Sequence, residues 1–366
     1  MDEIGKVPEV GDEGRIDREV DTDGDVETDD AIDSDNEFDW DGPRDAERAE
    51  ISTLIYLEDT KELSVQRSVE IGDGLRIEKL DTRLRRDLFD NCRPVRYRSR
   101  LERFQDFYTH RFFMPLPTTS RKQYASHQEL LPFLKASVLA RIVKPTAIPY
   151  EAPWVKTFYK TDGTAEHSSR VVVGGLSVAY TTYGSGNEHN TLTQDDVDTM
   201  ARLWPAFSEI TDQTNHPVFA RIFRAIWLFE QLHALPFIES QTQLAAAALE
   251  SLICTHFSNN KAQVTQRLVQ VCGIDKAQAV AVYELYCDFK HSGRGLQLEP
   301  QPDDTWTPTD AARRDAANLL QRCVRDLLRA ALEDREFALD LADVTRLRAK
   351  HPVLDQNGNV LKYKGE

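Results

Sequence analysis

The segment that decides the fold is Tyr283–Gly295, which reads YELYCDFKHSGRG. Its first nine residues continue a helical pattern, and Gly293 and Gly295 then favour an end to the helix. The segment 237–253, FIESQTQLAAAALESLI, precedes it and reads as a second helix with almost no charge. We therefore expect two packed helices, with His291 presented at the mouth of a helical bundle.

Further helical patterns surround these two segments. Thr193 and Asp196 mark the start of one helix, and Asn260 and Asp275 are placed to cap the starts of two later helices. Ser126–Glu129 reads as a capping box that opens an earlier helix. The apolar stripes are expected to contain Val197, Met200, Trp204, Phe207, Phe219, Ile222, Ile226, Phe229, Leu249, Leu252, Phe257, Leu320, Leu327 and Ala331. All of these helices belong to one predicted helical bundle over residues 191–350.

The N-terminal half shows a different pattern, with strand-like alternation as its main signal. The expected elements are strands at Ile51–Leu57, Glu62–Ile71, Trp154–Tyr159 and Arg170–Tyr180, a turn at Gly72–Gly74 and a helix at Ser126–Lys144. The fold class is therefore α+β, with a strand-rich domain over residues 50–190 ahead of the bundle. Residues 351–366 are expected to form a hairpin or tail, because Asn357–Gly358 is typical of a type I′ turn.

Acidic residues concentrate at the N-terminus. Residues 1–50 contain 21 Asp and Glu and 5 Lys and Arg, a net charge of −16 that equals the net charge of the whole chain. The remaining residues are balanced in charge, so the low isoelectric point does not argue against a nucleic-acid partner. We expect residues 1–49 to be a disordered acidic arm that contacts a protein partner or shields an RNA-binding surface.

The composition argues against several classes of protein. No apolar run of about 18 residues predicts a membrane span, and the acidic N-terminus does not resemble a secretory signal. The five cysteines form no Cys-x-x-Cys pair, which argues against a zinc site or a disulfide framework. Asp21–Asp25 lacks the glycine and glutamate positions of a calcium loop. We therefore expect a cytoplasmic protein with no metal, no cofactor and no membrane partner.

The two helices quoted first resemble the HEPN superfamily, most closely its Apea-like branch. That branch has an Ala-Leu-Glu helix, matched here by Ala248–Glu250, and then a helix of the form Tyr-x-Leu-Arg-x-x-x-x-His-Gly. Tyr283, Leu285 and His291 fit this pattern. Tyr286 occupies the place of the motif arginine. The resemblance implies a homodimer that acts on RNA without a metal, in phage defence, abortive infection or toxin–antitoxin activity.

The resemblance also implies roles for individual residues. In the family the histidine moves a proton and the arginine holds the phosphate, so His291 is the candidate catalytic residue. Since the arginine is replaced, His291 could instead be structural or bind RNA. Glu250 could orient the His291 or Lys290 side chain, or lie on an exposed helix edge. Asp288 could hold the imidazole tautomer, or be a solvated acid.

Candidate RNA-binding residues lie beside the motif and upstream of it. They are Lys290, Arg294, Tyr286, Arg98, Arg100 and Arg103. The Tyr286 hydroxyl could donate to a phosphate, although core packing is the other interpretation. Residues 93–112 mix arginines with aromatic rings, as surfaces that bind single-stranded RNA do. The same residues could form a helix with an aromatic core face and a solvated basic face. A second basic stripe, read as solvated, contains Arg322, Arg325 and Arg329.

Two functions follow from these observations, and a third stays open. The first is a metal-independent endoribonuclease in which His291 handles the proton. The second is a catalytically degenerate HEPN module that binds RNA or a protein without cleaving RNA. The third is a dimeric scaffold with no role in nucleic-acid chemistry.

Overall fold

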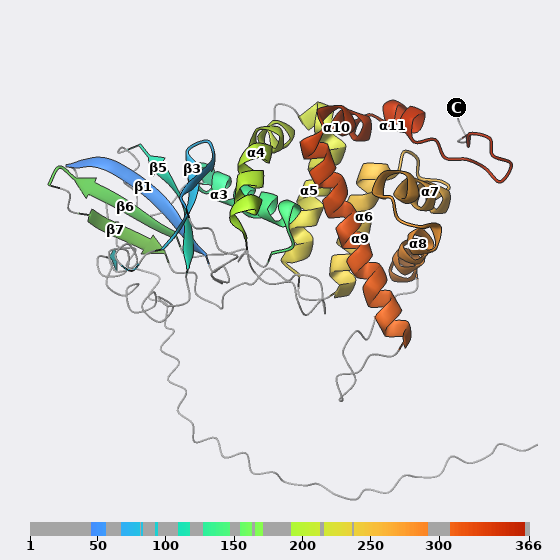
Figure 1. Ribbon diagram of the computed structural model, residues 1–366, viewed down its shortest axis with the longest axis horizontal. Helices are drawn as coiled ribbons and strands as arrows, with labels where there is room; N and C mark the ends of the chain where they lie inside the picture. Colours follow the sequence, from blue (N-terminus) through green and yellow to red (C-terminus); the bar gives the residue numbers. More distant parts are fainter. Residues whose placement is uncertain are drawn as a thin grey trace, which may run out of the picture. The chain divides into compact units, whose positions relative to one another are not determined.

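The computed structural model describes residues 45–55, 67–80, 82, 92–93, 109–117, 127–146, 154–162, 165–170, 192–212, 216–235, 238–291 and 308–362. Its strands are β1 (Ala46–Ile55), β2 (Val69–Gly72), β3 (Leu75–Lys79), β4 (Cys92–Arg93), β5 (His110–Leu116), β6 (Trp154–Lys160) and β7 (Ala165–Arg170). Its helices are α3 (His127–Val143), α4 (Gln194–Thr211), α5 (His216–His233), α6 (Ile238–Ile253), α7 (Asn260–Cys272), α8 (Lys276–His291), α9 (Pro308–Glu333), α10 (Arg335–Ala342) and α11 (Val344–Lys350). The predicted α+β class is confirmed (Figure 1). None of the described helices is both long and apolar enough to cross a membrane.

The sheet is antiparallel except at one edge. The strand order is β2-β3-β5-β1-β6-β7-β4, and β4 pairs with β7 in parallel. The central strand β1 pairs with β5 through Ile51 and Met114, and with β6 on its other side. A two-residue turn joins β2 to β3, and its residues Asp73 and Gly74 have φ angles of 53° and 77°. Positive φ at both positions is what a type I′ turn requires, so the predicted turn at Gly72–Gly74 is confirmed.

Apolar residues of the sheet join the helices in one core. Ile51, Phe112 and Phe158 are fully buried and share a hydrophobic cluster with residues of α3, α4, α6 and α9. Lys156 of β6 is also buried, and its ammonium pairs with Glu129 in the first turn of α3 at 3.1 Å. Because a buried ammonium is costly without a partner, this ion pair fixes α3 against the sheet.

Arg111 and Phe112 belong to strand β5, so the helix considered for residues 93–112 is wrong at its C-terminal end. Arg111 is 5% exposed and pairs with Glu50 of β1 at 2.9 Å and with Glu78 of β3 at 2.7 Å. Its guanidinium also lies 4.2 Å from the centre of the Phe113 ring. The strand forms because β1 and β3 satisfy its backbone on both sides, and such tertiary pairing overrides local helical spacing.

Helix α9 lies at the centre of the helical half. It contacts α3, α4, α5, α6, α7, α8 and α10, and Figure 1 shows it running across the other helices. Its predicted apolar residues Leu320, Leu327 and Ala331 are buried. The end of α9 leads directly into α10 through Asp334, whose carboxylate accepts hydrogen bonds from two backbone amides of that helix. A capped start of this kind fixes the direction of the following helix.

Helix α4 connects the sheet with the bundle. The helix begins at the predicted place, and its start is a capping box with reciprocal hydrogen bonds between Thr193 and Asp196. Trp204 lies against Gly72 of β2, and its indole N–H donates to Asp73 at 3.0 Å. The predicted division into two domains near residue 190 stays a prediction, because residues 171–191 lie outside the described part.

Three boundary predictions are corrected by the structure. Strand β1 begins at Ala46, so the acidic arm cannot extend to residue 49, and Ala49 is 1% exposed. Residues 1–44 lie outside the described part. Asn259, with a φ of 59°, is the N-cap of α7, and the amide of Asn260 is used elsewhere, on Glu250. Phe257 lies beyond the end of α6 and is 89% exposed, because its helix ends at Ile253.

The C-terminal hairpin is present but its turn differs from the prediction. Leu354 and Val360 form an antiparallel bridge. Gly358 has a φ of 80°, whereas Asn357 is not among the residues with positive φ, so the turn is not type I′. The Asp355 carboxylate accepts hydrogen bonds from the amides of Asn357 and Asn359 at 2.8 and 2.9 Å. This local side-chain bonding selects a different turn.

Candidate functional site

The helix that carries the predicted motif, α8, starts and packs as expected. Asp275 accepts a hydrogen bond from the Gln278 amide at 2.8 Å, and the Gln278 side chain accepts one from the Asp275 amide at 3.2 Å. Leu285 is 3% exposed and packs with Ile238 of α6. The described helix ends at His291, where the sequence predicts its end. The helix that carries the motif therefore begins and ends where the sequence predicts, and it packs against α6.

Several predicted site residues lie outside the described part of the chain. Arg98, Arg100, Arg103 and Arg294 are not described, and neither are the side chains of Lys290 and His291. The roles predicted for these six residues stay predictions. Tyr286, Glu250 and Asp288 are described, and the structure places each of them.

Tyr286 and Glu250 form a direct contact between α8 and α6. The Tyr286 hydroxyl donates to a Glu250 carboxylate oxygen at 2.5 Å, and the amide of Asn260 donates to the same oxygen at 3.2 Å. Both Tyr286 and Glu250 are half-buried, and the Tyr286 ring packs against the main core. Burial, and then the hydrogen bond to Glu250, raise the pKa of Tyr286. Tyr286 therefore packs against the core, as one of the two interpretations has it, and its hydroxyl bonds a carboxylate. A contact of this hydroxyl with phosphate stays a prediction.

Asp288 lies one helical turn before the end of α8 and pairs with another helix. Its carboxylate is 3.1 Å from the guanidinium of Arg313 on α9. The side chains of Asp288 and Arg313 are 55% and 34% exposed, so this ion pair is worth at most about 1 kcal/mol. Its predicted contact with the His291 imidazole stays a prediction.

The C-terminal end of α6 is bound by two arginines. Arg221 of α5 donates to the carbonyl oxygens of Ser251, Leu252 and Cys254 at 2.9, 3.0 and 2.7 Å. Arg267 of α7 is fully buried and donates to the carbonyls of Ile253 and His351. Burial, and then the charge of Arg267, lower the pKa of Arg221 to about 10, so Arg221 is still a cation at neutral pH. Cations at a helix C-terminus complement its dipole and its unpaired carbonyls.

The loop that follows, residues 254–259, is the α6–α7 loop, and its backbone is held by Gln263. This side chain is fully buried, accepts from the Thr255 amide at 2.8 Å and donates to the carbonyls of His256 and Ser258 at 2.8 and 2.7 Å. The loop presents Phe257, whose ring stacks on that of His256 with centroids 4.2 Å apart. The buried Gln263 side chain thus fixes the loop backbone, and the loop exposes one aromatic ring, that of Phe257.

A hollow opens beside the Tyr286–Glu250 contact. Its volume is about 500 Å³, and it is lined by Glu250, Cys254, Thr255, His256, Phe257 and Asn260. Lys261, with its side chain 61% exposed, lies 5.9 Å from the Tyr283 ring centre on the adjoining helices. The sequence did not single out this combination, because Phe257 was assigned to an apolar stripe. The residues that line the hollow are aromatic, polar and acidic, and one lysine, Lys261, lies nearby.

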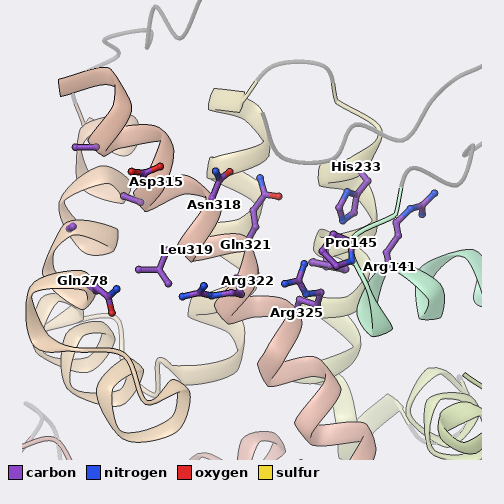
Figure 2. Close-up of a pocket in the computed structure, with 14 residues that line it drawn as sticks. Arg141, Pro145, His233, Gln278, Asp315, Asn318, Leu319, Gln321, Arg322 and Arg325 are labelled. Carbon is purple, nitrogen blue, oxygen red and sulfur yellow. The ribbon is translucent and has the colours of Figure 1, made fainter. Parts of the chain in front are cut away.

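A second cavity, the α9 cleft, has a volume of about 510 Å³ (Figure 2). Its polar lining consists of Arg141, His233, Gln278, Asp315, Asn318, Gln321, Arg322 and Arg325. Its apolar lining consists of Pro145, Phe229, Ala281, Ala312, Ala316 and Leu319. Helices α3, α5, α8 and α9 contribute these residues, except Pro145, which follows α3. Arg322 of the predicted solvated stripe is exposed, which agrees with that prediction, and Arg325 is half-buried; both also line this cavity.

The cleft collects residues that are distant in sequence. Arg141 is 1% exposed, and His233 is 5% exposed, with its ring edge-on to Phe229 at 4.9 Å. Helical spacing could indicate that Arg322 and Arg325 share a face, but the contribution of α3 depends on tertiary packing. No local signal could have found the whole set.

Within the described residues, no group of three or more His, Cys, Asp and Glu side chains is placed to hold a metal ion. Comparisons with protein-family models, with curated proteins and with solved structures gave no significant match.

Proposed function

We propose that the helical half of this protein binds single-stranded RNA without cleaving it. The proposal depends on one observation, the hydrogen bond from Tyr286 to Glu250. In the HEPN pattern that this helix resembles, an arginine at the place of Tyr286 stabilises the developing phosphate charge. A phenol cannot neutralise a phosphate, and the acceptor of this phenol is a carboxylate, which repels phosphate. The contact therefore favours the degenerate module over the nuclease.

Recognition of RNA is supported by the α6–α7 loop. Unpaired bases stack on exposed aromatic rings, and each such contact contributes about 1–3 kcal/mol. Phe257 is 89% exposed and is supported from behind by His256, and the loop backbone is fixed by Gln263. Because the ring is already held in place, stacking a base on it costs little conformational entropy. Lys261, 61% exposed and 4.0 Å from the Glu284 carboxylate, adds a partly neutralised cation close by.

A binding assay and a cleavage assay together test this function. Fluorescence anisotropy with a labelled short single-stranded RNA at low salt would compare the full chain with Phe257→Ala. We expect Phe257→Ala to weaken RNA binding about tenfold. Trp227→Ala is the matched control, because Trp227 is another exposed aromatic residue, 53% exposed, on α5. This control should leave the affinity unchanged.

The cleavage assay compares the wild-type chain with His291→Ala on the same RNA. We expect both proteins to leave the RNA intact. Products with 2′,3′-cyclic phosphate ends from the wild type, and none from His291→Ala, would restore the nuclease function. Absence of RNA affinity even at low salt would favour the scaffold function. The homodimer, the cytoplasmic location and a partner for the acidic N-terminal residues stay predictions.

A further inference from the structure

Two cysteines from different helices lie next to each other in the helical half. Cys272 is the last residue of α7, and Cys323 lies within α9. The two helices are in contact, Cys323 is a member of the main hydrophobic cluster, and Cys272 packs against that cluster. The Cys272 thiol donates a hydrogen bond to the Cys323 sulfur. The fold therefore pairs two sulfur atoms that are far apart in the sequence and belong to no Cys-x-x-Cys motif.

The two thiols differ in their access to solvent. Cys272 is half-buried, whereas Cys323 is only 1% exposed. Gly273 follows Cys272 with a φ of 66° and ends α7 there, so that Cys272 lies at the end of its helix. A small oxidant can therefore reach Cys272 from solvent. Cys323 can react only with a group that is already beside it, and the sulfur of Cys272 is such a group.

The surroundings of the pair favour a negative charge on Cys323. The hydrogen bond from Cys272 lowers the pKa of Cys323, burial opposes it, and the charge of Arg322 lowers the pKa further, against the smaller effect of Asp326. The same hydrogen bond, and then burial, raise the pKa of Cys272. The Cys323 thiolate is thus placed to accept the proton of the Cys272 thiol when Cys272 reacts, and the thiolate is the reactive form of cysteine.

We propose that Cys272 and Cys323 form a reversible disulfide bond when the protein meets a hydroperoxide. In the first step the Cys272 sulfur attacks a peroxide oxygen, the O–O bond breaks, and the Cys272 proton passes to the Cys323 thiolate. With hydrogen peroxide the products are a sulfenic acid on Cys272 and a hydroxide ion. In the second step the Cys323 sulfur attacks the Cys272 sulfur, the S–O bond breaks, and the hydroxide leaves with the Cys323 proton as water. The two sulfur atoms together lose two electrons, which reduce the peroxide.

The disulfide would join α7 to α9 covalently. A cross-link removes conformational freedom from the unfolded chain, so we expect the linked protein to melt about 3–6 °C higher than the reduced protein. The inference does not rest on the proposed function, because neither thiol lines the hollow beside the α6–α7 loop.

Peptide mapping of the full chain tests the proposal directly. The protein is treated with hydrogen peroxide, its remaining thiols are blocked with iodoacetamide in urea, and it is digested with trypsin without reductant. We expect mass spectrometry to find peptide 268–276 linked to peptide 323–325, and dithiothreitol to release both. Cys287→Ala is the matched control, because Cys287 is also half-buried but hydrogen-bonds Tyr283. This control should form the link to the wild-type extent.

Dimedone, which reacts with sulfenic acids, tests the order of the two steps. Cys323→Ala should accumulate the dimedone adduct on Cys272, whereas Cys272→Ala should leave Cys323 unlabelled. The mapping of the wild-type chain needs no variant, so the proposal stays testable if Cys323→Ala does not fold. The proposal is overturned if the folded wild type gives no linked peptide, or if urea-unfolded protein forms the link as readily as folded protein. A linked protein that melts no higher than the reduced one would also contradict it, because the bond would then strain the native packing of α7 on α9.

Discussion

Replacing Tyr286 with phenylalanine tests the contact on which the proposed function depends. The substitution removes the hydroxyl that donates to Glu250 at 2.5 Å and keeps the ring. A hydrogen bond to a charged acceptor contributes about 1.5–3 kcal/mol. Both side chains are half-exposed, and Asn260 still donates to the same carboxylate, so we reduce this to about 1 kcal/mol of unfolding free energy.

The loss should depend on pH. Burial, and then the bond to Glu250, raise the pKa of Tyr286 above the ordinary value of about 10. The folded state therefore holds this proton more tightly than the unfolded state. The corresponding stability is fully present below about pH 10 and is lost as the pH rises toward the folded-state pKa. The stability difference between wild type and Tyr286→Phe should consequently shrink above about pH 10.

Urea unfolding at neutral pH and at several alkaline pH values measures both effects. The matched control is Tyr283→Phe, which makes the same chemical change less than one turn earlier on α8, where the hydroxyl lies beside Cys287. A double-mutant cycle with Glu250→Gln isolates the pairwise coupling. The reasoning is refuted if Tyr286→Phe costs no more than Tyr283→Phe at neutral pH, or if Tyr286 and Glu250 show no coupling.

Two further predictions concern the sheet. Arg111→Met should destabilise the protein by about 3–5 kcal/mol, because it leaves Glu50 and Glu78 beside each other without their shared cation. A loss of unfolding free energy under about 1 kcal/mol in chemical denaturation would contradict this prediction. Gly72→Ala should cost about 1–3 kcal/mol, because the added methyl carbon would lie 2.0 Å from the Trp204 ring. Calorimetry would show this as a lower melting temperature, and an unchanged melting temperature would mean that the ring shifts without cost.

Elements with strong local signals could be predicted from the sequence. The capping box of α4, the capped start of α8 and the buried stripe of α9 depend on residues within one or two helical turns of each other. Such signals act through neighbouring side chains and backbone amides, so they are visible in a single segment. The same holds for the turn at Asp73, where the residue types fit a type I′ conformation.

The features that were missed depend on contacts between distant segments. Strand β5 is satisfied by β1 and β3, and Arg111 is neutralised by carboxylates 61 and 33 residues away. The exposure of Phe257 follows from where α6 ends, which arginines from α5 and α7 determine by binding its last carbonyls. The α9 cleft needs α3, which is far earlier in the chain. Periodicity within one segment carries no information about such partners.

The arginines around the α6–α7 loop explain why stacking, and not charge, should dominate there. Arg221, Arg267 and Arg348 all donate to backbone carbonyls at or after the end of α6. Their charges are directed inward and hold the loop, so they are not presented to a phosphate. The described part of this surface presents outward the ring of Phe257 and the ammonium of Lys261, which pairs with the exposed Glu284 carboxylate at 4.0 Å. A site of this composition suits unpaired bases.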